Sequence, residues 1–78
     1  MNVYIKYFGR AGELAETESE NLDLPENITS GEFKEILIQR KPALAELSFQ
    51  LAVNHKLHTE EKLKDGDKLA VLPPFAGG

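Results

Sequence analysis

The chain has 78 residues, of which 41% are hydrophobic and 28% are charged, proportions typical of a soluble globular protein. They exclude a disordered or collagen-like chain, and no apolar run approaches the roughly 18 residues that cross a bilayer. The 9 basic and 13 acidic residues give a formal charge of −4, the opposite of the basic surface with which nucleic-acid binders neutralise phosphates.

The length of the chain and its cysteine content further limit the class of protein to which it can belong. We expect residues 1–78 to fold as a single domain, because compact domains run from roughly 50 to 250 residues. Cysteine is absent, so the chain has no disulfide and no thiolate that could act as nucleophile, metal ligand or sulfur carrier. The lack of disulfides and of a signal segment fits a cytoplasmic protein. The excess of acidic over basic residues favours a protein partner with a basic patch.

The first elements predicted along the chain are a strand and a loop. Residues 3–8 are rich in β-branched and aromatic side chains, and Val3, Ile5 and Tyr7 alternate onto one face. This pattern is typical of a central strand. Residues 9–12 contain two glycines and predict a loop.

A weaker strand pattern follows over residues 18–24, and Pro25 ends it. We expect Glu16, Glu18 and Glu20 to form a solvated or edge face, where charge discourages pairing with other chains. A catalytic pair of carboxylates would need a partner group nearby, and the sequence places none there.

The strongest helix signal begins at Thr29. Glu32, three residues later, completes the pattern of a capping box, in which each side chain bonds the backbone N–H of the other residue. Apolar side chains with helical spacing follow, and Pro42 ends the predicted helix at about Lys41. Such a helix is long enough to cross a small sheet.

The second half of the chain predicts short elements. Residues 43–47 predict a turn of helix, and residues 49–54 alternate in polarity and predict a strand. Residues 55–64 are polar and predict mostly loop, with room for one short strand. We expect Leu57 and Leu63 to anchor this loop.

The last strand is predicted over residues 68–72. Asp65-Gly66 predicts the turn before it, and Pro73 and Pro74 end it because proline cannot donate to the ladder. The order of elements favours an α+β fold, with one main helix packed across a mixed sheet of four or five strands. The first and last strands can then pair at its centre.

The sequence shows no independent active site. His55 and His58 do not predict a metal site, since a metal needs three or four converging ligands. Ser30 and Ser48 lie outside any nucleophile-elbow pattern. No glycine-rich phosphate loop is present either.

The chain ends in an unusual segment, residues 73–78. Its sequence is Pro73-Pro74-Phe75-Ala76-Gly77-Gly78. The prolines direct the segment outward in an extended path, and Phe75 would contribute about 1.5–3 kcal/mol if a partner buried it. Gly77 and Gly78 have no Cβ and can enter a channel too narrow for a side chain. This pattern indicates a carboxylate presented to the active site of another protein.

On these residues the chain resembles the small subunit of molybdopterin synthase, the MoaD family, over essentially its whole length. The most specific stretches are Val53-Asn54, Leu63-Lys64-Asp65-Gly66-Asp67 and residues 72–78, and residues 3–8 resemble the opening of the family. The resemblance implies a ubiquitin-like β-grasp fold.

The resemblance also implies a sulfur carrier in molybdenum cofactor biosynthesis. The Gly78 carboxylate would be adenylated with ATP on a ubiquitin-activating-like adenylyltransferase, and a sulfur donor would displace AMP to leave a thiocarboxylate. The tail would then enter the large subunit of molybdopterin synthase, within a heterotetramer, and give sulfur to cyclic pyranopterin monophosphate. ATP and magnesium would be used by the activating partner, and this chain would bind no cofactor or metal.

Residue roles follow from the same resemblance. Gly78 would react and Gly77 would give clearance. The expected partner-binding residues are Phe75, Pro73, Pro74, Ala76, Phe8 and Leu57, and Tyr7 is either a further contact or part of the core. Family members often carry Arg-Glu-Leu after the first strand. Here Gly12 stands where the arginine would be, and Arg10 is the candidate substitute.

Two other hypotheses remain open. One is a related ubiquitin-like sulfur carrier for thiamine synthesis or tRNA thiolation, with the same chemistry and another acceptor. The other is a ubiquitin-like protein modifier, or a binding module whose tail has no reaction. A modifier would be recovered attached covalently to lysines, whereas a carrier would not.

Overall fold

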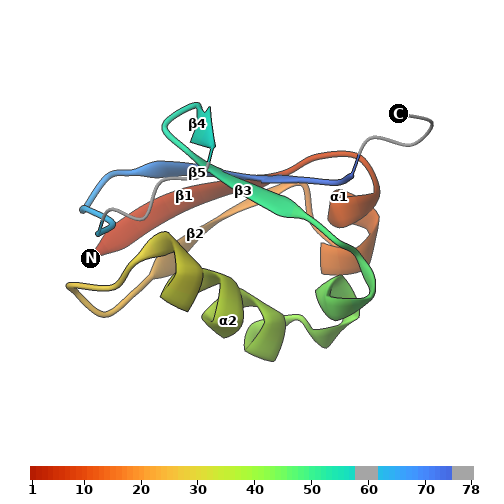
Figure 1. The fold of residues 1–78 in the computed structure, drawn as a ribbon, viewed down its shortest axis with the longest axis horizontal. Helices are drawn as coiled ribbons and strands as arrows, with labels where there is room; N and C mark the ends of the chain where they lie inside the picture. The colour runs from red at the N-terminus through yellow and green to blue at the C-terminus, as the bar shows by residue number, and fades with distance from the viewer. Residues whose placement is uncertain (58–61, 75–78) are drawn as a thin grey trace.

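The computed structural model describes residues 1–57 and 62–74 of the chain. Its elements are β1 (Asn2–Tyr7), α1 (Arg10–Ala15), β2 (Ser19–Asp23), α2 (Ser30–Arg40), the 3₁₀ helix η1 (Pro42–Glu46), β3 (Gln50–Val53), β4 (Lys56–Leu57) and β5 (Lys68–Leu72) (Figure 1). Within these residues, no helix has the length and apolar character needed to cross a bilayer.

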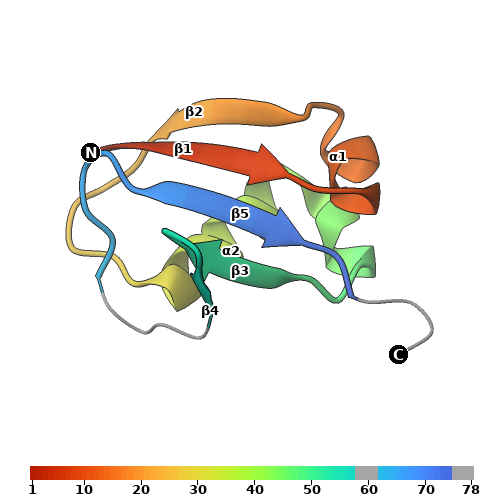
Figure 2. The same cartoon turned by 90° about the horizontal axis from the view of Figure 1, so that it is seen from above.

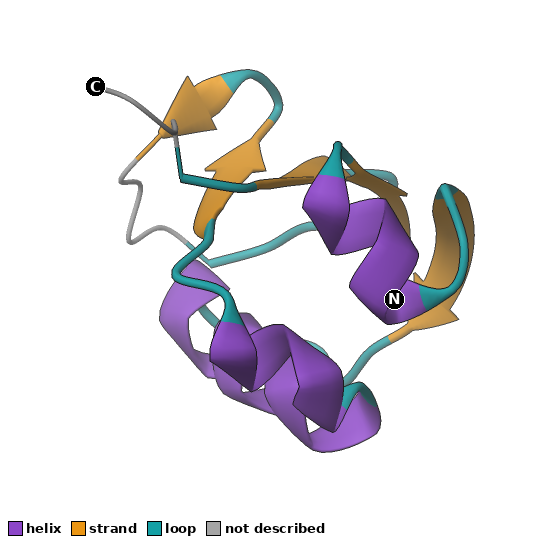
Figure 3. Ribbon diagram, turned by 90° about the vertical axis from the view of Figure 1, so that its right-hand side faces the viewer, coloured by secondary structure: helices purple, strands orange, loops and turns teal. Residues whose placement is uncertain are grey.

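The strands form a mixed sheet in the order β2-β1-β5-β3-β4 (Figure 2). β1 and β5 pair in parallel at its centre, and the other pairings are antiparallel. The helices lie on one side of the sheet, and the strands curve over them (Figure 3). The predicted α+β class, the ubiquitin-like β-grasp fold and the central pairing of the first and last strands are therefore confirmed.

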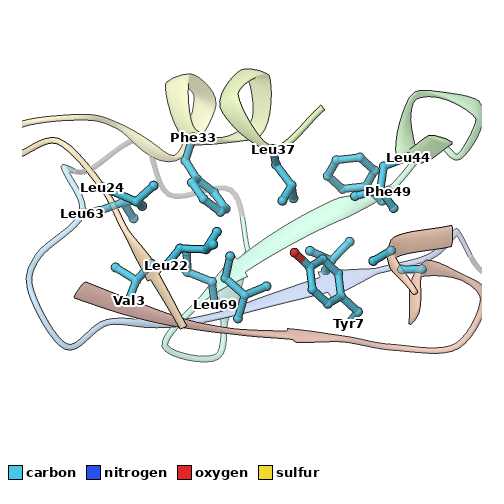
Figure 4. Close-up of a cluster of buried hydrophobic side chains, with 14 of the residues drawn as sticks. Val3, Tyr7, Leu22, Leu24, Phe33, Leu37, Leu44, Phe49, Leu63 and Leu69 are labelled. Carbon is cyan, nitrogen blue, oxygen red and sulfur yellow. The ribbon is translucent and has the colours of Figure 1, made fainter. Parts of the chain in front are cut away.

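The core lies between the sheet and the helices. The alternation predicted for β1 is confirmed, because Val3, Ile5 and Tyr7 are buried. From α2, Phe33 and Leu37 are fully buried and point toward the strand side chains (Figure 4). Burial of each large apolar side chain stabilises the fold by about 1.5–3 kcal/mol, so this one face of the sheet provides most of the packing energy.

The predicted capping box of α2 is present. The N–H of Glu32 donates to Thr29 Oγ1 at 3.2 Å, and the N–H of Thr29 donates to Glu32 Oε1 at 3.0 Å. The helix ends at Arg40, with Lys41 as its C-cap just before Pro42. Both predicted ends of the main helix are thus confirmed.

The loop predicted over residues 9–12 is wrong, because most of this stretch belongs to α1. Ala11 and Ala15 lie one turn apart and are both buried, so the short helix packs against the core through two small side chains. Gly12 lies inside the helix, where a Cβ would be 3.4 Å from the carbonyl oxygen of Tyr7. Here glycine permits close packing rather than breaking the chain.

The solvated face predicted for the acidic residues near β2 is wrong at Glu20. β2 is an edge strand, as expected, and Glu16 and Glu18 are exposed. Glu20 is half-buried and accepts a hydrogen bond from the Tyr7 hydroxyl at 2.7 Å. Lys41 Nζ lies 3.5 Å from the same carboxylate, so Glu20 links Tyr7 of β1 to Lys41 at the end of α2.

The loop before β5 is held at both ends. Leu63 is buried, and its N–H donates to the carbonyl of Ile28 at 2.8 Å. The predicted turn at Asp65-Gly66 is confirmed: Asp65 Oδ1 accepts from the N–H of Asn2 at 2.6 Å, and Gly66 has a φ of +86°. These contacts fix where β5 enters the centre of the sheet.

Candidate functional site

One face of the sheet is not covered by the helices. Because successive side chains of a strand point to opposite faces, the residues of β1 and β5 that do not face the core face this side. The exposed apolar side chains gather here: Tyr4 is 39% exposed, Phe8 38% and Leu57 44%. Three large apolar side chains exposed on one face indicate a surface that contacts a partner.

These side chains surround a hollow of about 430 Å³, which we call the open-face groove. It is lined by Tyr4, Lys6, Phe8, Ala52, His55, Leu57, Lys68, Leu69, Ala70 and Leu72. The groove spans the two central strands and the β3–β4 end of the sheet, so its shape depends on the pairing of strands distant in sequence.

The β3–β4 hairpin carries Leu57 onto this face. Its two turn residues, Asn54 and His55, both have positive φ, 48° and 71°, as a type I′ hairpin turn requires. The Asn54 side chain donates to Asp67 at 2.9 Å and accepts from the N–H of Lys68 at 3.0 Å, which ties the turn to β5. Leu57 does not anchor the loop into the core as predicted, because its side chain is exposed.

The charges that line the open-face groove are basic. Lys6 and Lys68 line it together with His55, and among the described residues no carboxylate does so. Lys6 Nζ lies 5.1 Å from the centroid of the Phe8 ring, within the range of a cation–π interaction. The net negative charge of the chain is therefore carried on other surfaces.

A second hollow, of about 530 Å³, carries acidic residues. It is lined by Tyr7, Gly9, Gly12, Glu13, Glu16, Thr17 and Glu18, and we call it the acidic hollow. Arg10, the candidate substitute for the family arginine, lies beside it on α1, with its guanidinium 3.6 Å from Glu13. Both side chains of this ion pair are mostly exposed, so the pair adds little to stability.

The root of the tail lies next to both surfaces. Pro73 is half-buried and Pro74 exposed just after β5, and a Cβ on Gly9 would lie 3.4 Å from Cγ of Pro73. Gly9 lines the acidic hollow, and the preceding residue, Phe8, lines the open-face groove. The remaining predicted tail residues lie outside the described part of the chain: Phe75, Ala76, Gly77 and Gly78.

A polar cluster lies on the opposite, helix-covered side of the sheet. Burial, together with the hydrogen bond to Glu20 and its charge, raises the pKa of Tyr7 above its ordinary value of 10.0. Lys41 Nζ donates to the carbonyl of Ala15 at 3.1 Å and lies 5.9 Å from the Tyr7 ring centroid. Tyr7, which the sequence left open as core or interface, is thus a core residue.

Chemical groups for catalysis are sparse in the described structure. Residues 1–57 and 62–74 contain no group of three or more His, Cys, Asp or Glu side chains placed to hold a metal ion. His55 is exposed at the hairpin turn, and His58 lies outside the described residues.

Sequence reasoning missed part of the open face. Tyr4, Lys6 and Lys68 line the groove but were not singled out. The sequence pattern could have identified Tyr4 and Lys6, because they alternate with the core residues of β1. The exposed Phe8 continues the same alternation. Lys68 needed the parallel register between β1 and β5, which places it beside Tyr4.

Known proteins resemble this chain over nearly all of its length. The ThiS family matches residues 5–78. The molybdopterin synthase sulfur carrier subunit of Drosophila yakuba is 33% identical, with an alignment that covers 100% of this chain and 92% of that protein.

Solved structures agree with this similarity. A structure of the complex of subunits 1 and 2 of molybdopterin-converting factor from Helicobacter pylori contains a chain 27% identical to this one, with a TM-score of 0.70 and coverage of 100% of both chains. SAMP1 from Haloferax volcanii has a TM-score of 0.84 at 24% identity, again over 100% of both chains. The second likeness, at this identity, shows the fold alone.

Proposed function

This chain belongs to the ThiS family, and we propose that it is the sulfur carrier subunit of a molybdopterin synthase. In this proposal, Gly78 becomes a thiocarboxylate and gives its sulfur to cyclic pyranopterin monophosphate. Similarity over the whole chain to relatives named as sulfur carrier subunits supports the assignment. The structural observation that carries it is the apolar open face, which continues through Phe8 and Gly9 to the root of a Gly-Gly tail at Pro73.

The proposed chemistry begins by activating the terminal carboxylate. A carboxylate oxygen of Gly78 attacks the α-phosphorus of ATP, pyrophosphate leaves, and an acyl-adenylate forms. Hydrosulfide from a sulfur donor then adds to the acyl carbon and AMP leaves, which gives the thiocarboxylate. Because the chain has no cysteine, the terminus is the place where it can carry transferable sulfur.

ATP and magnesium belong to the activating partner in this proposal. That partner is a ubiquitin-activating-like adenylyltransferase, whose metal ion neutralises charge on the phosphates during nucleotidyl transfer. The contribution of this chain is to dock and to present its end. Glycine at positions 77 and 78 suits a narrow entrance, since neither residue carries a side chain.

The second proposed partner is the large subunit of molybdopterin synthase, in a heterotetramer. The Helicobacter pylori complex of subunits 1 and 2 supports such a pairing. We assign Phe8 and Leu57 on the open face to the docking surface, together with the tail residues Pro73, Pro74, Phe75 and Ala76. The basic patch expected of a partner would face the acidic hollow beside the tail root.

Intact-mass spectrometry tests the carrier assignment. The protein is incubated with ATP, magnesium, a candidate adenylyltransferase and a sulfur source, and the expected product has one terminal oxygen replaced by sulfur. A chain that lacks Gly78 is the control: it should fold normally and gain no sulfur, because the reacting carboxylate is displaced. Molybdopterin formation by the truncated chain would contradict the assignment.

A second assay identifies the acceptor. The thiocarboxylated protein is mixed with a large subunit and cyclic pyranopterin monophosphate, and formation of the dithiolene product is followed. Sulfur transfer to a thiamine precursor or to tRNA, without transfer to the pterin, would instead assign the chain to a related carrier. Recovery of the chain on lysine side chains would assign it to the protein modifiers.

A further inference from the structure

Gly9 has a backbone conformation that other residues rarely adopt. Its φ is 54° and its ψ −130°, close to the values of the first central residue of a type II′ turn. The N–H of Ala11 donates to the carbonyl of Phe8 at 3.0 Å and closes this turn. A residue with a Cβ meets steric conflict in this region, so the sharp turn from β1 into α1 depends on glycine.

The parallel ladder of β1 and β5 ends at the same point. The N–H of Phe8 donates to the carbonyl of Val71 at 3.0 Å. In a parallel ladder, the carbonyl of Phe8 would next accept from the N–H of residue 73. Pro73 has no N–H, so that bond is missing and the Phe8 carbonyl accepts from Ala11 instead. The chain after β5 is thereby released from the sheet.

The ring of Pro73 lies beside Gly9, at the end of the ladder. A Cβ built on Gly9 would lie 3.4 Å from Cγ of Pro73, so the bare backbone of Gly9 faces the proline ring. Pro73 is half-buried, whereas Pro74 is exposed. The first proline therefore lies beside the β1–α1 turn.

We propose that Gly9 is a positioning residue for the tail: its turn supports Pro73 and sets the direction in which the tail leaves β5. This inference rests on the proposed function, since direction matters only if the terminus reacts in a partner. If the direction of the tail changes, the open face stays intact, but the terminus is displaced from the reacting atoms in the partner. Misplacement by about 1 Å can lower a rate by about 100-fold.

The test compares two glycines with positive φ. Gly9→Ala and Gly66→Ala both place a Cβ on a left-handed backbone, but Gly66 has no atom within 4 Å of such a Cβ. We expect both variants to lower the Tm by about 4–8 °C. In steady-state thiocarboxylation by the adenylyltransferase, Gly9→Ala should lower kcat by about 10- to 100-fold with unchanged KM for the carrier. Gly66→Ala should leave both constants unchanged.

A second variant tests the same positioning role if Gly9→Ala folds poorly. Pro73→Ala removes the ring that lies beside Gly9 and restores an N–H that can bond the Phe8 carbonyl, so it redirects the tail without straining the turn. It should show the same loss of kcat with an unchanged Tm.

The outcomes of these experiments distinguish the positioning role of Gly9 from the proposed carrier function on which it depends. A wild-type chain that gains no sulfur would contradict the proposed function. A reactive wild type with equal kcat in Gly9→Ala and Gly66→Ala would overturn the positioning role alone. A raised KM with unchanged kcat in Gly9→Ala would also overturn it, because the defect would then lie in docking.

Discussion

The two faces of the sheet come from the same strands but differ in what they contact. On β1, Val3 and Ile5 are buried beneath the helices, whereas Tyr4 on the same strand and Phe8 directly after it are exposed on the other side. One face therefore holds the domain together, and the other leaves apolar surface available to a partner. Mutations of side chains packed against the covered face and of side chains on the open face should accordingly separate stability from binding.

The largest expected effect on stability comes from the covered face. Phe33→Ala removes a ring that is 0% exposed, and we expect it to lower the free energy of unfolding by about 3–5 kcal/mol. Urea denaturation followed by circular dichroism measures the loss. A decrease below about 1 kcal/mol would show that the core closes around the site and that the covered face is not the main source of stability.

The matched change on the open face should affect binding instead. Phe8→Ala truncates a side chain that is 38% exposed, and we expect the Kd for the large subunit to rise by about 10- to 30-fold. Isothermal titration calorimetry gives the Kd, and urea denaturation should show a small change in stability. Gln39→Ala, on an exposed position of α2, is the control and should bind like the wild type. Equal affinity of both variants would remove Phe8 from the docking surface.

A smaller effect is expected at the polar cluster of the covered face. Tyr7→Phe removes the hydroxyl that donates to Glu20, and we expect a loss of about 0.5–1.5 kcal/mol at neutral pH. Burial and Glu20 raise the pKa of Tyr7 above 10.0, so the folded state retains the proton longer than the unfolded chain. Stability must then fall as pH rises beyond that value.

Denaturation at about pH 8 and about pH 11 tests this sign. The wild type should lose more stability between the two conditions than Tyr7→Phe, because the variant has no hydroxyl to titrate. The chain has two tyrosines. In a Tyr4→Phe background, ultraviolet absorbance therefore follows the ionisation of Tyr7 directly. An equal pH dependence in wild type and Tyr7→Phe would refute the raised pKa.

The smallest effect is expected from the exposed acids of the acidic hollow. The double change Glu16→Gln and Glu18→Gln should slow association with a basic partner by about 2- to 5-fold at low salt and have no effect at high salt. Stopped-flow kinetics at both ionic strengths measures this. The control, Glu26→Gln with Glu35→Gln, removes the same charge from other exposed positions. Equal slowing in both pairs would mean that net charge, rather than the hollow, steers association.

Local signals in the sequence were enough to predict most of the fold. Alternation identified β1 and β5, the Thr29–Glu32 spacing identified the start of α2, and Asp65-Gly66 identified the turn before β5. Each of these features depends on residues close together in the chain. The role expected of the tail also rests on a short local sequence, residues 73–78, and stays a prediction.

The errors have a common cause in contacts between distant residues. α1 forms despite Gly12 because Ala11 and Ala15 pack into the core, which local propensity does not reveal. Glu20 is held by Tyr7 and Lys41, from other parts of the chain. The open-face groove likewise depends on the order and register of the strands.

The parallel pairing of β1 with β5 has a consequence for the timing of biosynthesis. The centre of the sheet needs a strand that ends at Leu72, so residues 1–72 must all be synthesised before the sheet can close. Contacts of such long sequence separation form late, because the entropy of a large loop must be overcome first. The tail follows this last strand directly. A partner that binds the paired sheet would therefore not recognise a chain whose synthesis has stopped before Leu72.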